Sequence, residues 1–219
     1  APVGPRLARP AGGARHLAMI PEDGRERIAW PSPLGPFLKR IADFADRPTC
    51  ILCSGDPMWF GVGTRLAGLL PPSAYVVHSA PSSGALACAR LGWSFADVEA
   101  VSLHGRPRDA LRAAAGPGRR LLALTDAPDS PARIAETLAA MGLGASAMSV
   151  FERIGGPAER RIDGIAADWG ADAVDPLHIV AIDCAPDAGA DPRPPGPLLT
   201  DDAFAHDGQM TKQDQRASA

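Results

Sequence analysis

Short apolar runs that alternate with stretches of helical periodicity constrain the fold of this chain more than any other feature. Runs typical of buried strands occupy residues 49–53, 74–77, 98–103, 121–125, 147–151 and 178–182. Apolar residues at helical spacing fill several of the intervals, at residues 37–44, 63–70, 84–91, 108–115 and 131–141. Because strands that alternate with helices pack as parallel sheets covered by helices, the sequence predicts an α/β protein with mainly parallel sheets.

Turn-forming residues divide the chain into segments. Gly116-Pro117-Gly118, followed by two arginines, interrupts the pattern near the middle of the chain. We therefore predict an N-terminal α/β lobe over residues 12–115 and a C-terminal α/β lobe over residues 119–184. Residues 185–219 are rich in Pro, Asp, Gly and Ala and have little to bury, which is typical of a linker.

Residues 1–11 match neither a strand pattern nor a helix pattern. They are rich in Pro, Arg, Gly and Ala, and the chain starts without methionine. Because an α/β lobe normally opens with a strand, we expect the start of the N-terminal lobe to be truncated or replaced.

Composition excludes several classes of protein. Hydrophobic residues make up 46% of the chain and charged residues 21%, which is enough to bury one or two ordinary cores. No run approaches the roughly 20 apolar residues that cross a bilayer, and no secretory signal pattern is present, so we expect a cytoplasmic protein. The net charge is −3, and the acidic excess lies in residues 183–219. The near-neutral remainder has no clustered basic face of the kind that binds nucleic acid.

The four cysteines are too few for a disulfide framework, which agrees with the expected compartment. Cys50 and Cys53 lie in one apolar run, where a separation of three places their side chains on opposite faces of a strand. Buried core thiols are the favoured interpretation, and a redox or metal-binding pair is the alternative.

The loop Ser54-Gly55-Asp56-Pro57-Met58-Trp59-Phe60-Gly61-Val62-Gly63 follows a predicted strand and precedes a predicted helix, the position at which α/β sheets bind ligands. Gly55 permits close approach of the backbone to a ligand, while Gly61 and Gly63 permit a tight passage into the helix. Asp56 either accepts hydrogen bonds from a ligand or caps backbone amides of the turn. A nicotinamide site is not indicated, because the full G-x-G-x-x-G pattern and its acidic partner are missing.

Two further strand ends carry polar side chains. Ser82 and Ser83 precede a predicted helix, so one of them is expected to cap it and the other is free to bind a ligand. His104 and Arg106 end the next strand and are either solvated loop residues or partners for carboxylates of a substrate.

Together the three loops resemble one family. S-G-D-P-M-W-F-G-V-G, then P-S-S with A-R-L-G-W, then S-L-H-G-R-P, in this order, closely resemble the precorrin-6Y C5,15-methyltransferases of the tetrapyrrole methylase family. The resemblance continues through residues 121–126, the helix from Pro131 and residues 152–160, and it covers about residues 12–183. It implies two α/β lobes, with the methyl donor S-adenosylmethionine between them.

The resemblance also implies the reaction, which is methylation of a precorrin-6Y-type corrinoid at carbons 5 and 15 in cobalamin biosynthesis. It implies donor-binding residues, carried over one by one: Ser54, Gly55, Asp56, Trp59, Ser82, Ser83, Leu124 and Thr125. Three basic residues are our own extension, proposed because corrinoids carry many carboxylates: His104, Arg106 and Arg108. No catalytic residue is assigned, and neither a metal nor a covalent nucleophile is expected.

Two departures from the family pattern lead to further expectations. Family members open with a strand and a glycine-rich loop, and that first strand is expected to be missing here. Residues 201–212 resemble the junction that leads, in fused members, into a decarboxylase domain, so a decarboxylase domain or subunit is an expected partner. A homodimer is another expectation.

Two alternatives remain beside this assignment. The chain could be a catalytically inactive fragment that at most binds tetrapyrrole or a partner subunit. It could instead be another methyltransferase of the tetrapyrrole methylase family, which shares its two-lobe plan with the diphthine-forming enzymes.

Overall fold

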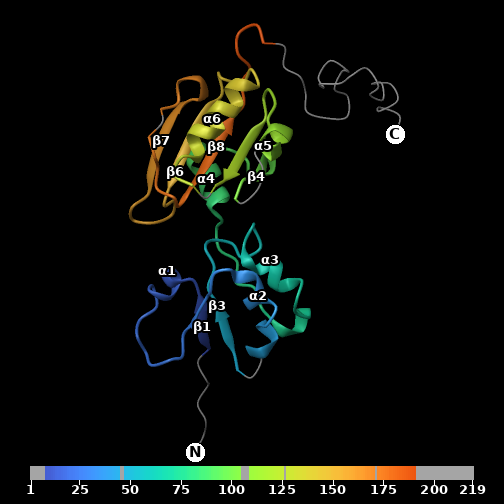
Figure 1. Ribbon diagram of the computed structural model, residues 1–219, viewed down its shortest axis with the longest axis vertical. Helices are drawn as coiled ribbons and strands as arrows, with labels where there is room; N and C mark the ends of the chain where they lie inside the picture. The colour runs from blue at the N-terminus through green and yellow to red at the C-terminus, as the bar shows by residue number, and fades with distance from the viewer. Residues whose placement is uncertain (1–7, 45–46, 105–108, 126, 171, 191–219) are drawn as a thin grey trace, which may run out of the picture. The chain divides into compact units, whose positions relative to one another are not determined.

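A computed structural model describes residues 8–44, 47–104, 109–125, 127–170 and 172–190 of the chain. The chain divides into two compact units, Ala1–Ser82 (unit 1) and Ser83–Ala219 (unit 2). Each unit contains one β-sheet with helices packed around it (Figure 1). Within the described residues, no helix is both long enough and apolar enough to cross a membrane.

Unit 1 contains a fully parallel three-stranded sheet in the order β2-β1-β3. Its strands are β1 (Arg9–Gly12), β2 (Ile28–Ala29) and β3 (Thr49–Ile51). Its α-helices are α1 (Ala14–Leu17), α2 (Leu34–Leu38) and α3 (Val62–Ala67), with 3-10 turns at Ile41–Phe44 and Pro72–Ala74. The prediction of parallel strands is confirmed for this sheet.

β1 corrects the interpretation of residues 1–11, because a strand begins at Arg9 in the centre of the sheet. Pro10 lies inside this strand although proline cannot donate a hydrogen bond to a ladder. The backbone groups of Pro10 and Gly12 point to the same side of β1, the side of β2. There the Gly12 carbonyl accepts from the N–H of Trp30, the residue after β2. β2 begins at Ile28, opposite Ala11. Among the described residues, therefore, no residue of β2 lies opposite Pro10, and the N–H that proline lacks is not needed for this pairing. Whether the first strand of the family is missing is not tested by this sheet and stays a prediction.

The strand predicted over residues 74–77 is wrong. Pro72–Ala74 form a 3-10 turn, and residues 75–78 follow without pairing to a strand of the described sheet. The backbone at Tyr75 is nevertheless extended, with φ −147° and ψ 160°. A strand pattern alone does not make a strand, because backbone groups need a neighbouring strand to pair with.

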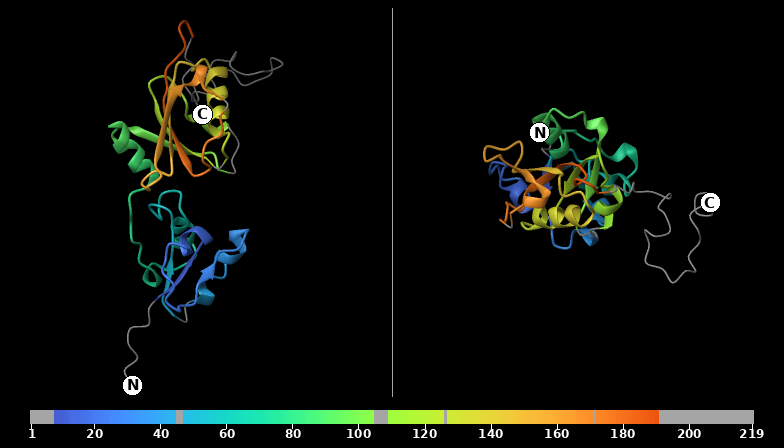
Figure 2. Two further views of the ribbon diagram at one scale, coloured as in Figure 1. Left: turned by 90° about the vertical axis from the view of Figure 1, so that its left-hand side faces the viewer. Right: turned by 90° about the horizontal axis from the view of Figure 1, so that it is seen from above.

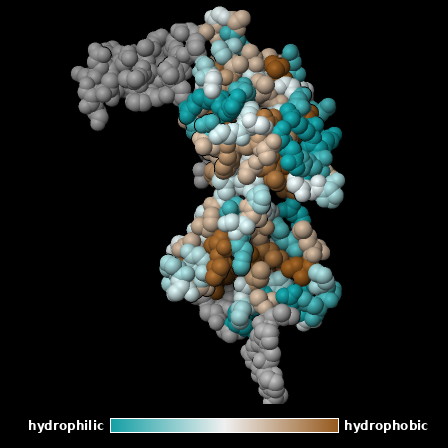
Figure 3. All heavy atoms as spheres, turned by 180° about the vertical axis from the view of Figure 1, so that it is seen from behind, coloured by the Kyte–Doolittle hydropathy of each residue, from teal (hydrophilic) through white to brown (hydrophobic). Residues whose placement is uncertain are grey.

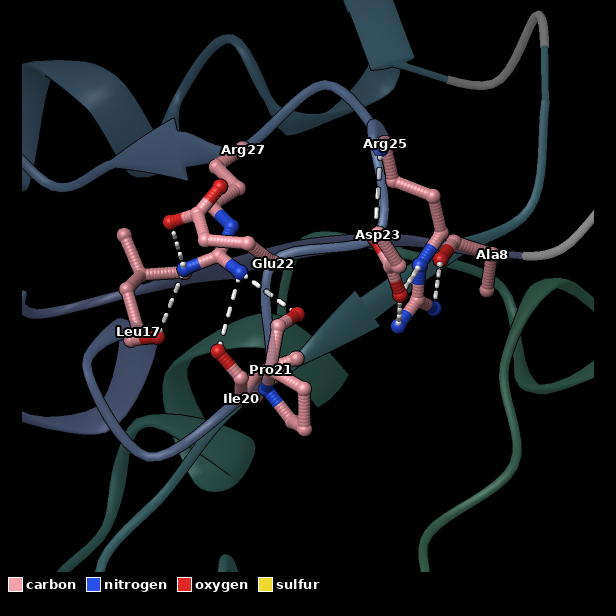
Figure 4. Close-up of polar contacts among 8 residues, drawn as sticks. All are labelled: Ala8, Leu17, Ile20, Pro21, Glu22, Asp23, Arg25 and Arg27. Atoms are coloured by element: carbon pink, nitrogen blue, oxygen red, sulfur yellow. Dashed lines mark hydrogen bonds and ion pairs between the residues drawn. The ribbon is translucent and has the colours of Figure 1, made fainter.

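Two arginines brace the irregular loop from α1 to β2 (Figure 4). Arg27 donates to the carbonyl oxygens of Leu17, Ile20 and Pro21 at 3.0, 2.9 and 2.7 Å. Arg25 donates to the Ala8 carbonyl at 2.9 Å and to the carboxylate of Asp23. Because Leu17 is the last residue of α1, Arg27 fixes the end of the helix that follows β1.

Unit 2 contains a five-stranded sheet in the order β4-β5-β8-β6-β7. Its strands are β4 (Val98–Ser102), β5 (Arg120–Leu124), β6 (Ala147–Glu152), β7 (Arg160–Ile165) and β8 (His178–Asp183). Its α-helices are α4 (Ser83–Leu91), α5 (Asp109–Ala114) and α6 (Ser130–Ala140), with 3-10 turns at Phe95–Asp97 and Ala166–Asp168. Only β4 and β5 pair in parallel, so the prediction of mainly parallel strands does not hold for this sheet.

The core of unit 2 lies between the sheet and α6. Ile134 and Leu138 of α6 are buried against the sheet residues Val150 and Val180. α4 lies on the opposite face of the sheet from α6 (Figure 2). Arg90 of α4 holds the loop between β6 and β7 by donating twice to the Glu159 carboxylate, at 2.8 and 3.1 Å.

The units divide between Ser82 and Ser83, whereas the sequence suggested a boundary near Gly116. Residues 116–119 are a turn inside unit 2, because β4 before the turn pairs with β5 after it. The Gly118 N–H donates to the Cys184 carbonyl at 2.8 Å, which fixes this turn against the residue that follows β8.

Candidate functional site

The carboxyl end of the sheet in unit 1 brings together side chains suited to bind a ligand. Parallel sheets covered by helices bind ligands in the loops that follow their strands. α1 follows β1 directly, and the loop of residues 54–61 follows β3 and leads into α3. Side chains from these two segments meet in one cluster.

Arg15, His16 and Ser54 form this cluster. The Arg15 Nη2 donates to the Ser54 Oγ at 2.7 Å, and the His16 Nε2 lies 2.9 Å from the same oxygen. Burial and the neighbouring Arg15 guanidinium lower the pKa of His16, which favours the uncharged imidazole at neutral pH. The cluster therefore combines a fixed positive charge, a neutral ring nitrogen and a hydroxyl group.

The loop after Ser54 is shaped by its glycines. Gly55 has a φ of +59°, a left-handed conformation that glycine adopts without strain. A Cβ atom on Gly61 would lie 2.5 Å from the Pro57 carbonyl oxygen, and one on Gly63 would lie 2.6 Å from it. These glycines leave room for the close approach of the Pro57 carbonyl at the start of α3, which agrees with the predicted tight passage into the helix.

Asp56 caps the turn. Its Oδ1 accepts from the Met58 N–H at 2.7 Å, which confirms the capping interpretation of this residue. The carboxylate has further lone pairs beyond this bond, so capping orients the group and leaves acceptor capacity at the sheet edge.

Two aromatic residues follow in the same loop. The rings of Trp59 and Phe60 meet edge to face, with centroids 5.1 Å apart. Phe60 has a φ of +52° and is 49% exposed, so a bulky residue adopts a strained conformation and still presents its ring to solvent. Arg153 is the other non-glycine described with positive φ, and its side chain pairs with Asp175 at 2.6 Å.

The second predicted loop lies at the division between the units. Ser82 ends unit 1 and is buried, with 6% of its surface exposed, and Ser83 is the first residue of α4. Ser82 thus occupies the N-cap position of α4, as predicted for one of the two serines. Their predicted contact with a donor stays a prediction.

Unit 2 contains a polar network at one end of its sheet, around Thr125. Leu124 is the last residue of β5, and the Thr125 Oγ1 lies 2.6 Å from the His178 Nε2. The His178 Nδ1 lies 2.7 Å from the Asp175 carbonyl oxygen. Because a carbonyl can only accept, Nδ1 carries a proton, and in the neutral ring Nε2 accepts from the Thr125 hydroxyl.

Glu152 anchors the same network. It lies opposite His178 in the β6–β8 ladder, and its side chain is 6% exposed. The carboxylate accepts from both Nε and Nη2 of Arg160 and from the Asp175 N–H. The Arg160 guanidinium and this backbone bond lower the pKa of Glu152 to about 2, against the desolvation that would raise it.

The basic residues proposed for the substrate are only partly described. His104 is exposed in the turn after β4. Arg106 and Arg108 lie outside the described residues, so their predicted role stays a prediction.

The sequence did not indicate three residues of these sites: Arg15, His16 and His178. Arg15 and His16 lie in the helix that begins right after Gly12-Gly13, a glycine pair at the end of β1. Recognition of β1 would have placed them at the same sheet edge as Ser54. His178 opens a strand, and its link to Thr125 depends on the antiparallel pairing of β5 with β8, which the sequence did not indicate.

Comparison with known proteins identifies the family. Residues 38–168 match the model of the Tetrapyrrole (Corrin/Porphyrin) Methylases. A precorrin-6Y C(5,15)-methyltransferase (decarboxylating) from Sinorhizobium sp is 41% identical over 207 residues, covering 94% of this chain and 50% of the relative. A cobalt-precorrin-7 C(5)-methyltransferase from Salmonella typhimurium is 33% identical over 168 residues, covering 75% of this chain and 83% of the relative.

Solved structures show the same fold. The cobalamin biosynthesis precorrin-6Y methylase from Archaeoglobus fulgidus aligns with a TM-score of 0.56 and 24% identity, over 82% of this chain and 86% of that protein. The uroporphyrin-III C-methyltransferase from Thermus thermophilus, complexed with S-adenyl homocysteine, aligns with a TM-score of 0.61 and 22% identity, over 81% and 86%.

The chain spans about half the length of the precorrin-6Y relatives that it matches. The relative from Salmonella typhimurium, by contrast, is covered over most of its length. The family model also extends from α2 in unit 1 to the 3-10 turn after β7 in unit 2. From these matches it follows that the chain belongs to the tetrapyrrole (corrin/porphyrin) methylases.

Proposed function

We propose that this chain transfers methyl groups from S-adenosylmethionine to carbons 5 and 15 of a precorrin-6Y-type corrinoid. The observation that carries the proposal is the Arg15, His16 and Ser54 cluster beside the glycine-shaped loop at the carboxyl end of the unit 1 sheet. The name of the relative from Sinorhizobium sp supports methylation of a precorrin at carbons 5 and 15. The name of the relative from Salmonella typhimurium supports a precorrin substrate and methylation at carbon 5.

The residues present fit such a donor. S-adenosylmethionine has ribose hydroxyls, an ammonium group and a carboxylate, and it supplies an electrophilic methyl group when bound. Gly55 lets the backbone approach it closely, and Ser54 offers a hydroxyl. The capped Asp56 carboxylate keeps lone pairs for hydroxyl or ammonium groups.

For this reaction the protein must hold a ring carbon of the corrinoid against the methyl group and accept one proton. A ring carbon of the corrinoid forms a bond to the methyl carbon, the sulfur–carbon bond breaks, and the electron pair stays on sulfur. The ring carbon then loses its proton to restore conjugation. In our proposal Arg15 binds a substrate carboxylate by a charge-assisted hydrogen bond, and the uncharged His16 accepts this proton.

Further parts of the proposal concern the rest of the protein. We assign the decarboxylation named in the longer relatives to residues outside this chain, as a domain or subunit that works with it. A homodimer and a cytoplasmic location also belong to the proposal. Their support is the family resemblance alone.

The donor site is tested by calorimetric titration of the folded chain with S-adenosylhomocysteine. We expect saturable binding near one per chain. Ser54→Ala should weaken it about 2- to 13-fold, since a hydrogen bond contributes about 0.5–1.5 kcal/mol. Arg40→Gln is the matched control, because Arg40 is exposed and pairs with Asp43 on a surface turn. Absence of binding by a chain shown to be folded would favour the inactive fragment.

The roles of Arg15 and His16 are tested by methyl transfer to the corrinoid. Arg15→Gln should raise KM for the corrinoid by a larger factor than it weakens S-adenosylhomocysteine binding, because Arg15 reaches the donor site only through its hydrogen bond to Ser54. His16→Gln should lower kcat and remove the acidic limb of the pH–rate profile, because its ring must be uncharged to accept a proton. Equal rates for His16→Gln and the unsubstituted chain across pH would exclude His16 as the acceptor.

A further inference from the structure

The buried polar network around His178 in unit 2 is more informative about ligand binding than the polar surface. Hydrophilic side chains are spread over the face of both units shown in Figure 3, so exposure alone does not single out a binding group. Buried donors and acceptors, by contrast, must be paired, and their hydrogen bonds have a fixed direction. Only 9% of the His178 surface is exposed. The network lies where β5 and β6 end and β8 begins, at one end of the sheet.

Backbone contacts and ion pairs hold the His178 ring in place. Its Nδ1 donates to the Asp175 carbonyl at 2.7 Å. The Asp175 N–H in turn donates to the Glu152 carboxylate at 2.8 Å, and Glu152 also accepts from Arg160. The Asp175 carboxylate pairs with Arg153. Each carboxylate of this network therefore already has an arginine partner, and the buried ring is favoured in its neutral form, because an additional buried charge would be costly.

The neutral ring gives the Thr125 hydroxyl a direction. With the proton on Nδ1, the Nε2 that lies 2.6 Å from the Thr125 Oγ1 can only accept. The Thr125 hydroxyl therefore donates its one proton to His178, and the oxygen keeps its lone pairs. Thr125 directly follows β5 and is half-buried, so its side chain still reaches the surface. Toward a ligand, Thr125 is thus an acceptor and not a donor.

We propose that His178 is a positioning residue that makes Thr125 a hydrogen-bond acceptor for an N–H group of the methyl donor. The inference rests on the proposed function, because it takes Thr125 as part of the donor site. An N–H group requires an acceptor of fixed direction, whereas a hydroxyl can exchange the two roles. The donor offers such groups in its adenine amino group and its ammonium group. A carboxylate, which only accepts, is disfavoured at Thr125.

Nitrogen NMR of the chain with isotope-labelled histidine tests the direction of the hydrogen bond without any ligand. The chain has five histidines, and the signals that disappear in His178→Asn identify His178. At neutral pH we expect a protonated Nδ1 and an unprotonated Nε2. A ring protonated at both nitrogens, or at Nε2 alone, would overturn the proposal, because Thr125 would then accept from His178.

Two substitutions of His178 separate positioning from packing. The amide of asparagine reaches about as far as Nδ1, so His178→Asn keeps the bond to Asp175 and loses the one to Thr125. The longer side chain in His178→Gln places an amide oxygen near the site of Nε2 and restores an acceptor. In calorimetric titration, His178→Asn should weaken S-adenosylhomocysteine binding at least about 2-fold, and His178→Gln should recover most of the loss. A purely structural role would lower the affinity in both variants.

A double substitution tests whether His178 acts through Thr125. Thr125→Val removes the hydroxyl and should weaken S-adenosylhomocysteine binding about 2- to 13-fold, the range for one hydrogen bond. His178→Asn should have no further effect in the Thr125→Val chain, since the group that it positions is gone. Thr125→Ser, which keeps the hydroxyl, is the matched control.

Two analogues of S-adenosylhomocysteine identify the N–H group. S-inosylhomocysteine has a carbonyl in place of the adenine amino group, and a second analogue has hydrogen in place of the homocysteine amino group. We expect Thr125→Val to leave the affinity unchanged for the analogue that lacks the group bound by Thr125. The other analogue should lose affinity as S-adenosylhomocysteine does, by a larger factor if the bound group is the charged ammonium.

The outcomes separate this inference from the proposed function. Additive effects of His178→Asn and Thr125→Val would overturn the inference, as would an equal effect of Thr125→Val on S-adenosylhomocysteine and on both analogues. In these cases S-adenosylhomocysteine still binds the unsubstituted chain, and the proposed function stands. Absence of S-adenosylhomocysteine binding by the folded, unsubstituted chain would overturn both.

Discussion

Single residues determine the conformation of the loop after β3. At two of its glycines there is no room for the methyl group of an alanine. Gly61 and Gly63 lie so close to the Pro57 carbonyl that a Cβ atom on either would overlap it. The need for glycine here could be read from the sequence, because a strand that passes directly into a helix requires close packing. The identity of the Ser54 partners could not, since Arg15 and His16 lie 39 and 38 residues away from it in the chain.

Gly63→Ala should destabilise unit 1 by about 1–3 kcal/mol, the usual cost of overpacking. Gly68→Ala is the control, because the nearest atom to its added Cβ would lie 3.6 Å away, an ordinary contact. Urea unfolding followed by tryptophan fluorescence measures both variants, in a chain with Trp93 and Trp169 replaced by Phe so that the signal comes from unit 1. A loss of stability in Gly63→Ala no larger than in Gly68→Ala would contradict this packing argument.

Cys50 and Cys53 show how a residue-level prediction failed. Their apolar run suggested buried core thiols, but Cys50 is exposed and Cys53 only half-buried. The run is typical of a strand covered on all sides, whereas β3 has a neighbour on one side alone among the described strands. Burial depends on neighbours that the local sequence does not specify.

At the scale of elements, the strands with apolar runs were predicted and the polar ones were not. β5, β6 and β8 lie close to their predicted bounds, because their runs are long and buried. β7 escaped prediction, since it is a sheet edge with arginines and an aspartate on its exposed positions. β2 was missed for another reason, because two residues are too few to show a period.

The β6–β7 pair should make stability depend on pH through Glu152. Its pKa is about 2 in the folded chain, below the ordinary value of 4.5, so the unfolded chain binds its proton first as pH falls. The stabilisation is complete above about pH 4.5 and disappears as pH falls toward about 2. Glu152→Gln should therefore cost at most about 3 kcal/mol near pH 6 and little near pH 2.

Urea unfolding of Glu152→Gln and the unsubstituted chain at several pH values measures this difference. Asp97→Asn is the control, because Asp97 is an exposed carboxylate in a 3-10 turn. A stability difference between Glu152→Gln and the unsubstituted chain that stays constant from pH 6 to pH 2 would contradict the role of the ionised carboxylate.

At the scale of the whole molecule, the two units differ in how much they bury. Among the described apolar side chains of unit 1, few are buried: Pro10, Ala11, Leu17, Leu38 and Ile41. Unit 2 has a continuous core that joins the buried faces of α5 and α6 to the sheet. The α/β class could be predicted because strand and helix patterns alternate along the chain. The division at Ser82 could not be predicted, because it depends on the pairing of β4 with β5 across residues 116–118, which the local sequence does not specify.

We expect two unfolding transitions, with unit 1 unfolding at lower urea concentration than unit 2. Each unit has two tryptophans, Trp30 and Trp59 in unit 1 and Trp93 and Trp169 in unit 2. Replacing either pair by Phe leaves fluorescence that reports on the other unit. Trp30→Phe should be well tolerated, because the Trp30 Nε1 is buried without a hydrogen-bond partner. Coincident transitions in the two double variants would show instead that the units unfold together.

The left-handed backbone conformation of Phe60 affects which residues are favoured at this position during evolution. Glycine at this position would relieve a strain of about 1–2 kcal/mol, and the exposed ring gives back little by packing. A lineage selected only for a folded chain would therefore drift toward glycine or asparagine at position 60. An aromatic ring that persists there would instead indicate selection for the ring itself, as expected if this loop holds the methyl donor proposed above.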